Sequence, residues 1–308
     1  MGFKLNKNDI RLLHALAEYR ILTVSQVTAI QQRGRQVIRR RLKRLREAGF
    51  VDSTSQGFGR GMGRPERLIS LAHGGIKLLR SHRESLKNVP DTSINAERLP
   101  FLDHQLLTNW FRIHLGHMEH SISQLSVRFL APTSPFLKRD HKDRPLIFER
   151  IPGEGNSGEP VGFTPDGVFS TKHRETQKTL LFFLEVDMGT ETIASPKRDP
   201  RDIRQKILNY QKYFRSGRYK RYEKVWDCEL NGFRLLFLTN TDSRLLALCR
   251  LVREMPPSDF VWITSLNKMF SDGLSAEIWF RGGGQENPLE SILGREMACR
   301  VPVLPLKA

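Results

Sequence analysis

The feature that most constrains the fold is a short apolar segment that ends in two carboxylates, Leu180 to Asp187. Its Leu, Phe and Val residues predict a strand in the interior of a sheet. Phe163 to Ser170 predicts an earlier strand, and the polar residues from Thr171 to Thr179 predict the turn between the two. We therefore expect a sheet built around this β-hairpin, with acidic side chains gathered at one end.

Three carboxylates lie on the predicted hairpin. Asp166 follows a proline at the start of the first strand, and Glu185 and Asp187 close the second. Side chains alternate along a strand, so Glu185 and Asp187 point to one face, and strand pairing brings Asp166 beside them. Grouped carboxylates at the end of an apolar strand are costly unless a cation offsets them, and oxygen ligands suit Mg²⁺ or Mn²⁺. The alternative is an ordinary strand end with solvated acids.

The chain has Pro165 and Asp166, then an apolar strand that ends in Glu-x-Asp. This order resembles the core of the restriction-endonuclease-like, or PD-(D/E)xK, superfamily. The resemblance implies that Asp166 and Glu185 hold a metal ion and that a lysine assists the attacking water. Asp187 stands where that superfamily usually has the lysine, so its expected role is to assist the other two acids.

Some branches of the superfamily carry the lysine on the next helix, and this chain has a candidate there. Asp199 to Phe214 predicts a helix with Lys206 and Tyr210 one turn apart. Lys206 is therefore the fourth expected catalytic residue, and a solvated lysine on a helix face is the alternative. Glu119, on a predicted helix from Leu102 to Leu125, is a further candidate carboxylate.

The N-terminal part of the chain is dense in helix signals. The patterns predict three helices and then two strands joined by a glycine-rich loop, at Asn8–Tyr19, Thr23–Ile30, Arg35–Ala48, Phe50–Ser53 and Arg67–Ala72. Three helices followed by a hairpin form the layout of a winged helix. In that layout the third helix enters the major groove of DNA and the hairpin touches the backbone.

The third predicted helix is strongly basic outside its apolar stripe. The residues expected to contact DNA are those on this helix and in the hairpin loop, namely Arg35, Arg39, Arg40, Lys43, Arg60 and Arg64. A solvated basic face is the alternative. The whole chain carries 50 Lys and Arg against 33 Asp and Glu, a net charge of +17, which favours a polyanion such as double-stranded DNA as the partner.

Other classes of protein fit the sequence less well. Charge alone would allow an anionic membrane surface, but the longest apolar run, Leu180 to Leu184, is far too short to cross a bilayer. The N-terminus has no apolar signal core. The three cysteines, Cys228, Cys249 and Cys299, have no metal-ligand spacing and are typical of reduced thiols. We expect a cytoplasmic protein without a membrane partner.

The sequence predicts two domains. Residues 1–85 form the winged helix, 86–100 a linker, 101–285 a nuclease-like domain and 286–308 a C-terminal tail. Strands and helices alternate after the hairpin, which favours a three-layer α/β domain. The expected class is therefore α/β with an N-terminal α+β unit.

Several motifs together are similar to those of the replication-relaxation family of plasmid and mobile-element proteins. They are RRRLKRLREAGFVD, LAHGGIKLL, LDHQLLTNW, the Pro-Asp pair, EVDMGTE and the K-x-x-x-Y of the later helix. The resemblance implies a winged helix joined to a nuclease-like domain, with a role in plasmid replication or DNA relaxation. In such proteins Glu-x-Asp takes the place of Glu-x-Lys.

Two classes of function remain open. The first is a Mg²⁺-dependent DNA endonuclease or nickase, in which Lys206 polarises the attacking water or stabilises charge on the phosphate. The second is a DNA-binding replication accessory or transcription regulator with a degenerate nuclease fold. No aromatic RNA-binding motif favours RNA as the substrate. A second copy of the chain and proteins of replication or relaxation remain open as partners.

Overall fold

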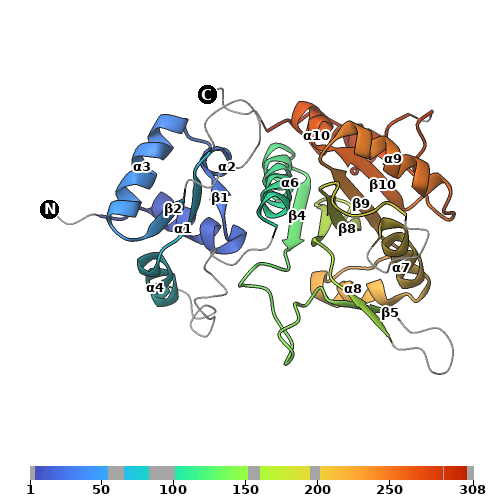
Figure 1. Ribbon diagram of the computed structural model, residues 1–308, viewed down its shortest axis with the longest axis horizontal. Coiled ribbons are helices and arrows are strands. Elements are labelled where there is room, and N and C mark those ends of the chain that lie inside the picture. The colour runs from blue at the N-terminus through green and yellow to red at the C-terminus, as the bar shows by residue number, and fades with distance from the viewer. Residues whose placement is uncertain are drawn as a thin grey trace. The chain divides into compact units, whose positions relative to one another are not determined.

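A computed structural model describes residues 4–54, 66–82, 101–151, 160–194, 202–286 and 288–303 (Figure 1). The chain divides into two compact units. The first is drawn from Met1–Ile113, Thr133–Asp140 and Val303–Ala308, and the second from His114–Pro132 and His141–Pro302. The mixed α/β class is confirmed. The predicted linker at 86–100 lies outside the described residues.

In the part of the first unit that the structure describes, three helices and a small antiparallel sheet are followed by a further helix. Its elements are α1 (Lys7–Tyr19), β1 (Leu22–Thr23), α2 (Val24–Gln31), α3 (Arg35–Glu47), β2 (Val51–Thr54), β3 (Leu68–Leu71) and α4 (His73–His82). The strand order in the sheet is β1-β3-β2. The first turns of α6 (Leu102–Ser121), up to Ile113, also belong to this unit.

Local sequence signals explain where these helices begin. Asn6 caps α1 in a capping box with Asp9, and Thr23 caps α2 in a capping box with Gln26. Helix α3 buries only its apolar stripe, Ile38, Leu42 and Leu45, against the core of the unit. The basic side chains of α3 therefore remain on its other sides.

The second unit is organised around a six-stranded sheet of order β11-β10-β9-β8-β7-β4. The described elements after α6 are β4 (Leu125–Leu130), β5 (Glu149–Ile151), β6 (Val161–Phe163), β7 (Gly167–His173), β8 (Thr179–Asp187), α7 (Ile203–Arg215), a 3₁₀ turn (Arg218–Lys220), α8 (Arg221–Trp226), β9 (Arg234–Thr239), α9 (Asp242–Arg253), β10 (Val261–Ser265), α10 (Leu266–Asp272), β11 (Phe280–Arg281) and a second 3₁₀ turn (Arg295–Met297). Strands β8, β9 and β10 are parallel, and the other neighbours in this sheet are antiparallel.

The structure corrects three predicted boundaries in this unit. The first hairpin strand begins at Gly167, because Pro165 has no N–H for the ladder; Phe163 belongs to β6, which pairs with β5 in a separate sheet. The helix predicted from Leu102 to Leu125 ends at Ser121, and Leu125 begins β4. The predicted turn from Thr171 to Thr179 is shorter, because β7 continues to His173 and β8 begins at Thr179.

Aromatic side chains fill both faces of the sheet at β8. Across β4, β7 and β8, Phe129, Phe169 and Phe182 are in register and stack in one row. On the other face of β8, Phe183 packs against the Tyr210 ring of α7 at a centroid distance of 5.6 Å and against Phe233 at 4.7 Å. Helix α7 therefore covers the face of β8 that holds Phe183 and Glu185, so side chains of α7 are the neighbours of Glu185.

A buried carboxylate joins α1 to α3 in the first unit. The Asp9 side chain accepts a hydrogen bond from the Asn6 backbone N–H and forms an ion pair with Arg41 of α3, and it is 2% exposed. We predict that Asp9→Ala lowers the free energy of unfolding by about 2–4 kcal/mol, because a buried ion pair and a helix cap are lost together.

The control is Glu47→Ala. Glu47 forms an exposed pair with Lys43 at 3.8 Å, and its loss should cost less than about 0.5 kcal/mol. Chemical denaturation of the purified variants measures both values. Equal effects of the two substitutions would show that Asp9 does not stabilise the α1–α3 contact.

Candidate functional site

An open cleft in the second unit collects most of the predicted catalytic residues. The cleft has a volume of about 720 Å³ and lies at the carboxyl end of β8, beside α7 and the connection from β6 to β7. Asp166, Glu185 and Lys206 line it, together with Glu191 and Asn209. Residues from three separate stretches of sequence therefore meet at one place, as predicted for Asp166, Glu185 and Lys206.

Glu185 is the most buried of these side chains. It lies on the face of β8 that carries α7, and its side chain is 5% exposed. Tyr210 Oη donates a hydrogen bond of 2.5 Å to Glu185 Oε1, and Lys206 Nζ lies 3.0 Å from Oε2. Burial raises the pKa of Glu185 to about 7, because loss of hydration outweighs the attraction of the Lys206 ammonium. Both partners are one turn apart on α7.

Asp166 lies where the β7–β8 ladder ends. The Asp166 N–H donates to the Leu184 carbonyl at 3.1 Å, and Asp166 Oδ2 accepts from the Val186 N–H at 2.8 Å. The Asp166 carboxylate thus accepts the hydrogen bond that a strand carbonyl would accept if β7 began before Gly167. A side chain at the next residue, Gly167, would require the Phe129 ring to move, since a Cβ there would lie 2.2 Å from that ring.

Lys206 lies between two carboxylates. Its Nζ is 3.0 Å from Glu185 Oε2 and 3.1 Å from Glu191 Oε2, and its side chain is 28% exposed. Burial alone would lower the pKa of Lys206, but the carboxylates of Glu185, Asp166 and Glu191 raise it above its ordinary value. Lys206 is therefore a permanent ammonium that is open to the cleft.

Asp187 does not join this group. Its carboxylate accepts from Arg244 Nε at 2.5 Å, from Arg244 Nη2 at 3.2 Å and from the Gly189 N–H at 2.9 Å. Strand β9 is parallel to β8, so α9 begins beside the carboxyl end of β8 and brings Arg244 to Asp187. Arg244 was not predicted; its position three residues after the cap that follows a parallel strand is the signal that could have revealed it.

The side chains in and around the cleft limit how a metal ion could be held. In the described part of the chain, no group of three or more His, Cys, Asp or Glu side chains is arranged to hold one. Glu119, the further candidate, accepts from the Val127 N–H at 3.0 Å instead. Magnesium commonly uses one or two protein carboxylates and keeps water and phosphate as its other ligands. Asp166 and Glu185 fit that role, whereas Asp187 is already paired with Arg244.

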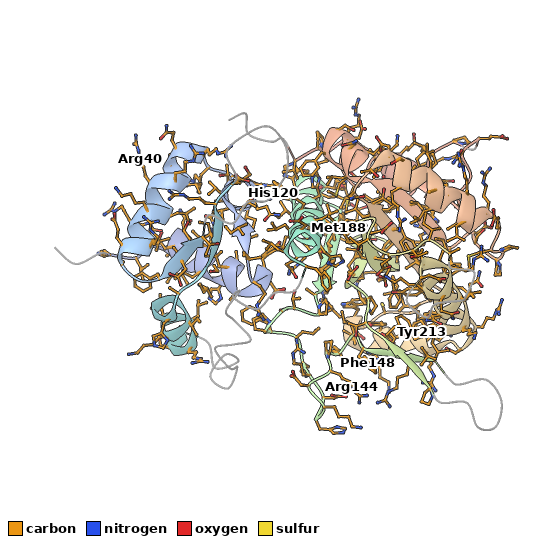
Figure 2. The ribbon with its side chains drawn as sticks, in the orientation of Figure 1. Arg40, His120, Arg144, Phe148, Met188 and Tyr213 are labelled. Atoms are coloured by element: carbon orange, nitrogen blue, oxygen red, sulfur yellow. The ribbon has the colours of Figure 1, made fainter. Side chains whose placement is uncertain are left out.

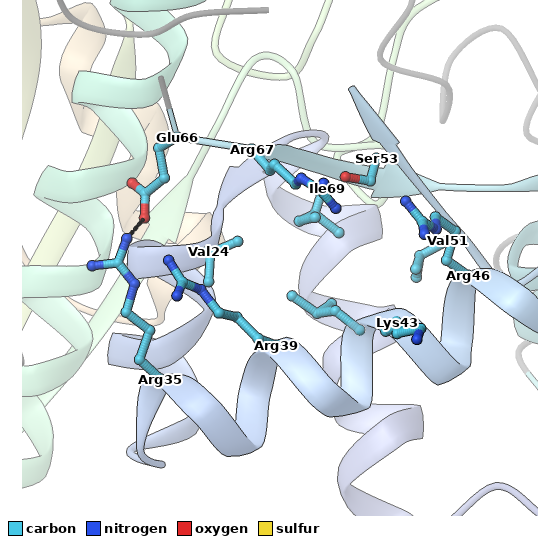
Figure 3. Close-up of a pocket in the computed structure, with 11 residues that line it drawn as sticks. Val24, Arg35, Arg39, Lys43, Arg46, Val51, Ser53, Glu66, Arg67 and Ile69 are labelled. Carbon is cyan, nitrogen blue, oxygen red and sulfur yellow. Dashed lines mark hydrogen bonds and ion pairs between the residues drawn. The ribbon is translucent and has the colours of Figure 1, made fainter. Parts of the chain in front are cut away.

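The predicted DNA-binding residues divide into three sets. Arg39, Arg40 and Lys43 are exposed on α3, and Arg40 projects outward from the helix (Figure 2). Arg35 pairs with Glu66 at 3.1 Å and is only 26% exposed, so it ties α3 to the segment before β3 (Figure 3). Arg60 and Arg64 lie outside the described residues.

The fold and the cleft define an α/β protein with a basic helical unit and a carboxylate–lysine site. A family model described as replication-relaxation matches residues 13–227, which is more than half of the 308 residues. The chain belongs to the replication-relaxation family. This membership indicates a role in replication or relaxation of plasmid or other mobile-element DNA, and with it an interaction with DNA.

Two further comparisons gave no match, one with curated proteins and one with solved structures. Among the helices that the structure describes, none is long and apolar enough to cross a bilayer.

The raised pKa of Glu185 leads to a prediction about pH. Between its ordinary pKa of 4.5 and about 7, the folded protein retains a proton that the unfolded chain releases. The contribution of Glu185 to stability should therefore be highest below pH 4.5 and fall as the pH rises to about 7, by roughly 2–3 kcal/mol.

Glu185→Gln removes the titration and keeps the shape. We expect the difference in unfolding free energy, wild type minus Glu185→Gln, to decrease between about pH 5 and pH 7 and then to level off. Denaturant unfolding of both proteins at each pH measures it. A difference that does not change over this range would mean that Glu185 titrates at its ordinary pKa.

Proposed function

We propose that this protein binds duplex DNA through its first unit and hydrolyses a phosphodiester bond at Asp166, Glu185 and Lys206. The observation that carries the proposal is the convergence of two carboxylates and one ammonium in an open cleft of an otherwise strongly basic protein. A restriction-endonuclease-like core would use these three groups, with the lysine supplied from α7 instead of from β8.

The roles of the side chains follow from their contacts. Mg²⁺ or Mn²⁺, when bound by Asp166 and Glu185, would polarise the phosphate and lower the pKa of a bound water. The Lys206 ammonium faces the cleft and would stabilise the negative charge that develops on the phosphate oxygens. Tyr210 and the Val186 N–H orient the two carboxylates through hydrogen bonds of 2.5 and 2.8 Å. The Arg244 guanidinium compensates the charge of the Asp187 carboxylate, so Asp187 has no role beside Asp166, Glu185 and Lys206 in the proposed reaction.

DNA binding is assigned to a winged helix in the first unit. The order of three helices and the β2–β3 hairpin fits that fold, and α3 presents Arg39, Arg40 and Lys43 to solvent. A helix of this kind occupies the major groove, where arginine pairs with guanine and phosphate contacts fix the position of the protein.

One observation favours a second function, that of a DNA-binding accessory without catalysis. The Lys206 ammonium already neutralises Glu185, and Arg244 neutralises Asp187. Two acids that are already paired with cations in this way can be stable without a metal ion, as expected for a nuclease fold that has become a scaffold.

Cleavage of supercoiled plasmid in Mg²⁺ or Mn²⁺ separates the two functions. We predict nicking or linearisation by the purified protein and at least a 100-fold loss of rate in Asp166→Asn and Lys206→Met, because each removes a group that contacts the phosphate or its ion. Lys220→Met, an exposed lysine after α7, is the control and should retain the wild-type rate. Salt-sensitive DNA binding without cleavage in either ion would establish the accessory function instead.

A further inference from the structure

A basic groove separates α3 from the β2–β3 hairpin in the first unit. It has a volume of about 380 Å³. Four cations follow one another along the groove side of α3, and a fifth lies opposite on the hairpin side (Figure 3); they are Arg35, Arg39, Lys43, Arg46 and Arg67. The spacing of three and four residues explains why the helical members share one side of α3.

Among the described residues that line this groove, Glu66 is the only acid, and its carboxylate already has partners. Glu66 Oε1 accepts from the Ser25 backbone N–H at 2.9 Å, from Ser25 Oγ at 2.5 Å and from Arg35 at 3.1 Å. Arg35 and Glu66 therefore form a closed pair at one end. Lys43 has only the exposed pair with Glu47 at 3.8 Å, and Arg39, Arg46 and Arg67 have no ion pair with any described residue, so the positive charge of these three arginines is not compensated there.

The floor of the groove is different from its rim. Leu42, Val51 and Ile69 are buried apolar residues beneath the cations, and the Ser53 hydroxyl adds a polar group on β2. A chain of alternating sugars and phosphates fits this combination, with sugar carbons over the floor and phosphate oxygens at the guanidinium groups.

The outer side of α3 has another character. Val37 is 57% exposed there, although the surrounding exposed residues of the helix, such as Gln36 and Arg40, are polar or charged. An apolar branched side chain can contact the methyl group of thymine, and Gln and Arg hydrogen-bond to adenine and guanine edges.

We propose that α3 uses two faces, so that the groove with Arg39, Lys43, Arg46 and Arg67 holds one phosphodiester strand of the duplex while the outer face meets the bases. This rests on the proposed DNA binding and deepens it. It assigns Arg46 and Arg67 to the backbone, and it removes Arg35 from the DNA contacts because Glu66 holds it. Affinity and sequence preference then depend on different residues of the same helix.

The test measures binding of a labelled duplex to the full-length protein by fluorescence anisotropy over a series of salt concentrations. Arg46→Gln and Arg67→Gln should each reduce the slope of log affinity against log salt by about 1 and weaken binding equally for duplexes of different sequence. Lys77→Gln, which removes an exposed charge from α4 outside the groove, is the matched control and should change neither.

Selection from a random-sequence duplex library tests the other face. Val37→Ala and Arg40→Gln should change the sequences recovered, whereas Arg46→Gln and Arg67→Gln should recover those of the wild type. Groove variants that behave like Lys77→Gln, or that alter the recovered sequences, would overturn the two-face assignment while DNA binding itself stands. Failure of the unmodified protein to bind any duplex would overturn the proposed DNA binding and this assignment with it.

Discussion

The candidate active site depends on one buried carboxylate. Glu185 lies near the end of a strand whose other side chains are almost all apolar, and it is kept there by Tyr210 and Lys206, both from α7. An isolated carboxylate in that position would be strongly destabilising. The packing of Tyr210 against Phe183 holds α7 on this face, so the same contact that completes the core also supplies the partners of Glu185. Removal of α7 would leave neither the cleft nor the charge balance.

Charge is handled differently in the two units. In the second unit, two buried acids at the end of β8 are each paired with a cation from a helix that follows a strand: Glu185 with Lys206, and Asp187 with Arg244. In the first unit the exposed sides of α3 carry cations in excess, and Glu66, the one acid among the described residues that line its groove, is bound by Ser25 and Arg35. Charges that are paired within the protein stabilise its fold, whereas cations without a paired acid remain able to bind an external anion. These cations of the first unit form the surface that we propose for binding DNA.

The sequence predicted well what depends on local pattern. The amphipathic α3, the apolar β8 and the helix that carries Lys206 follow from periodicity and caps, and the meeting of Asp166 with Glu185 follows from strand pairing. The pairing of Asp187 with Arg244 could not be predicted in that way, because the two residues are 57 positions apart in the chain. They meet only because β9 lies parallel to β8, which the local pattern does not reveal. The pairing of Arg35 with Glu66 could not be predicted for the same reason, since the two residues are 31 positions apart in the chain.

The unusual Glu-x-Asp motif has a physical explanation in these contacts. A lysine at position 187 would place its ammonium beside the Arg244 guanidinium, which is 14% exposed and could not be screened well by solvent. An aspartate there turns the same neighbour into a stabilising partner. Under the proposed function, the ammonium that a restriction-endonuclease-like core uses comes instead from Lys206, which reaches Glu185 from α7 at 3.0 Å. In the proposed site, Asp187 is thus a partner of Arg244, and Lys206 of α7 takes the role of the strand lysine.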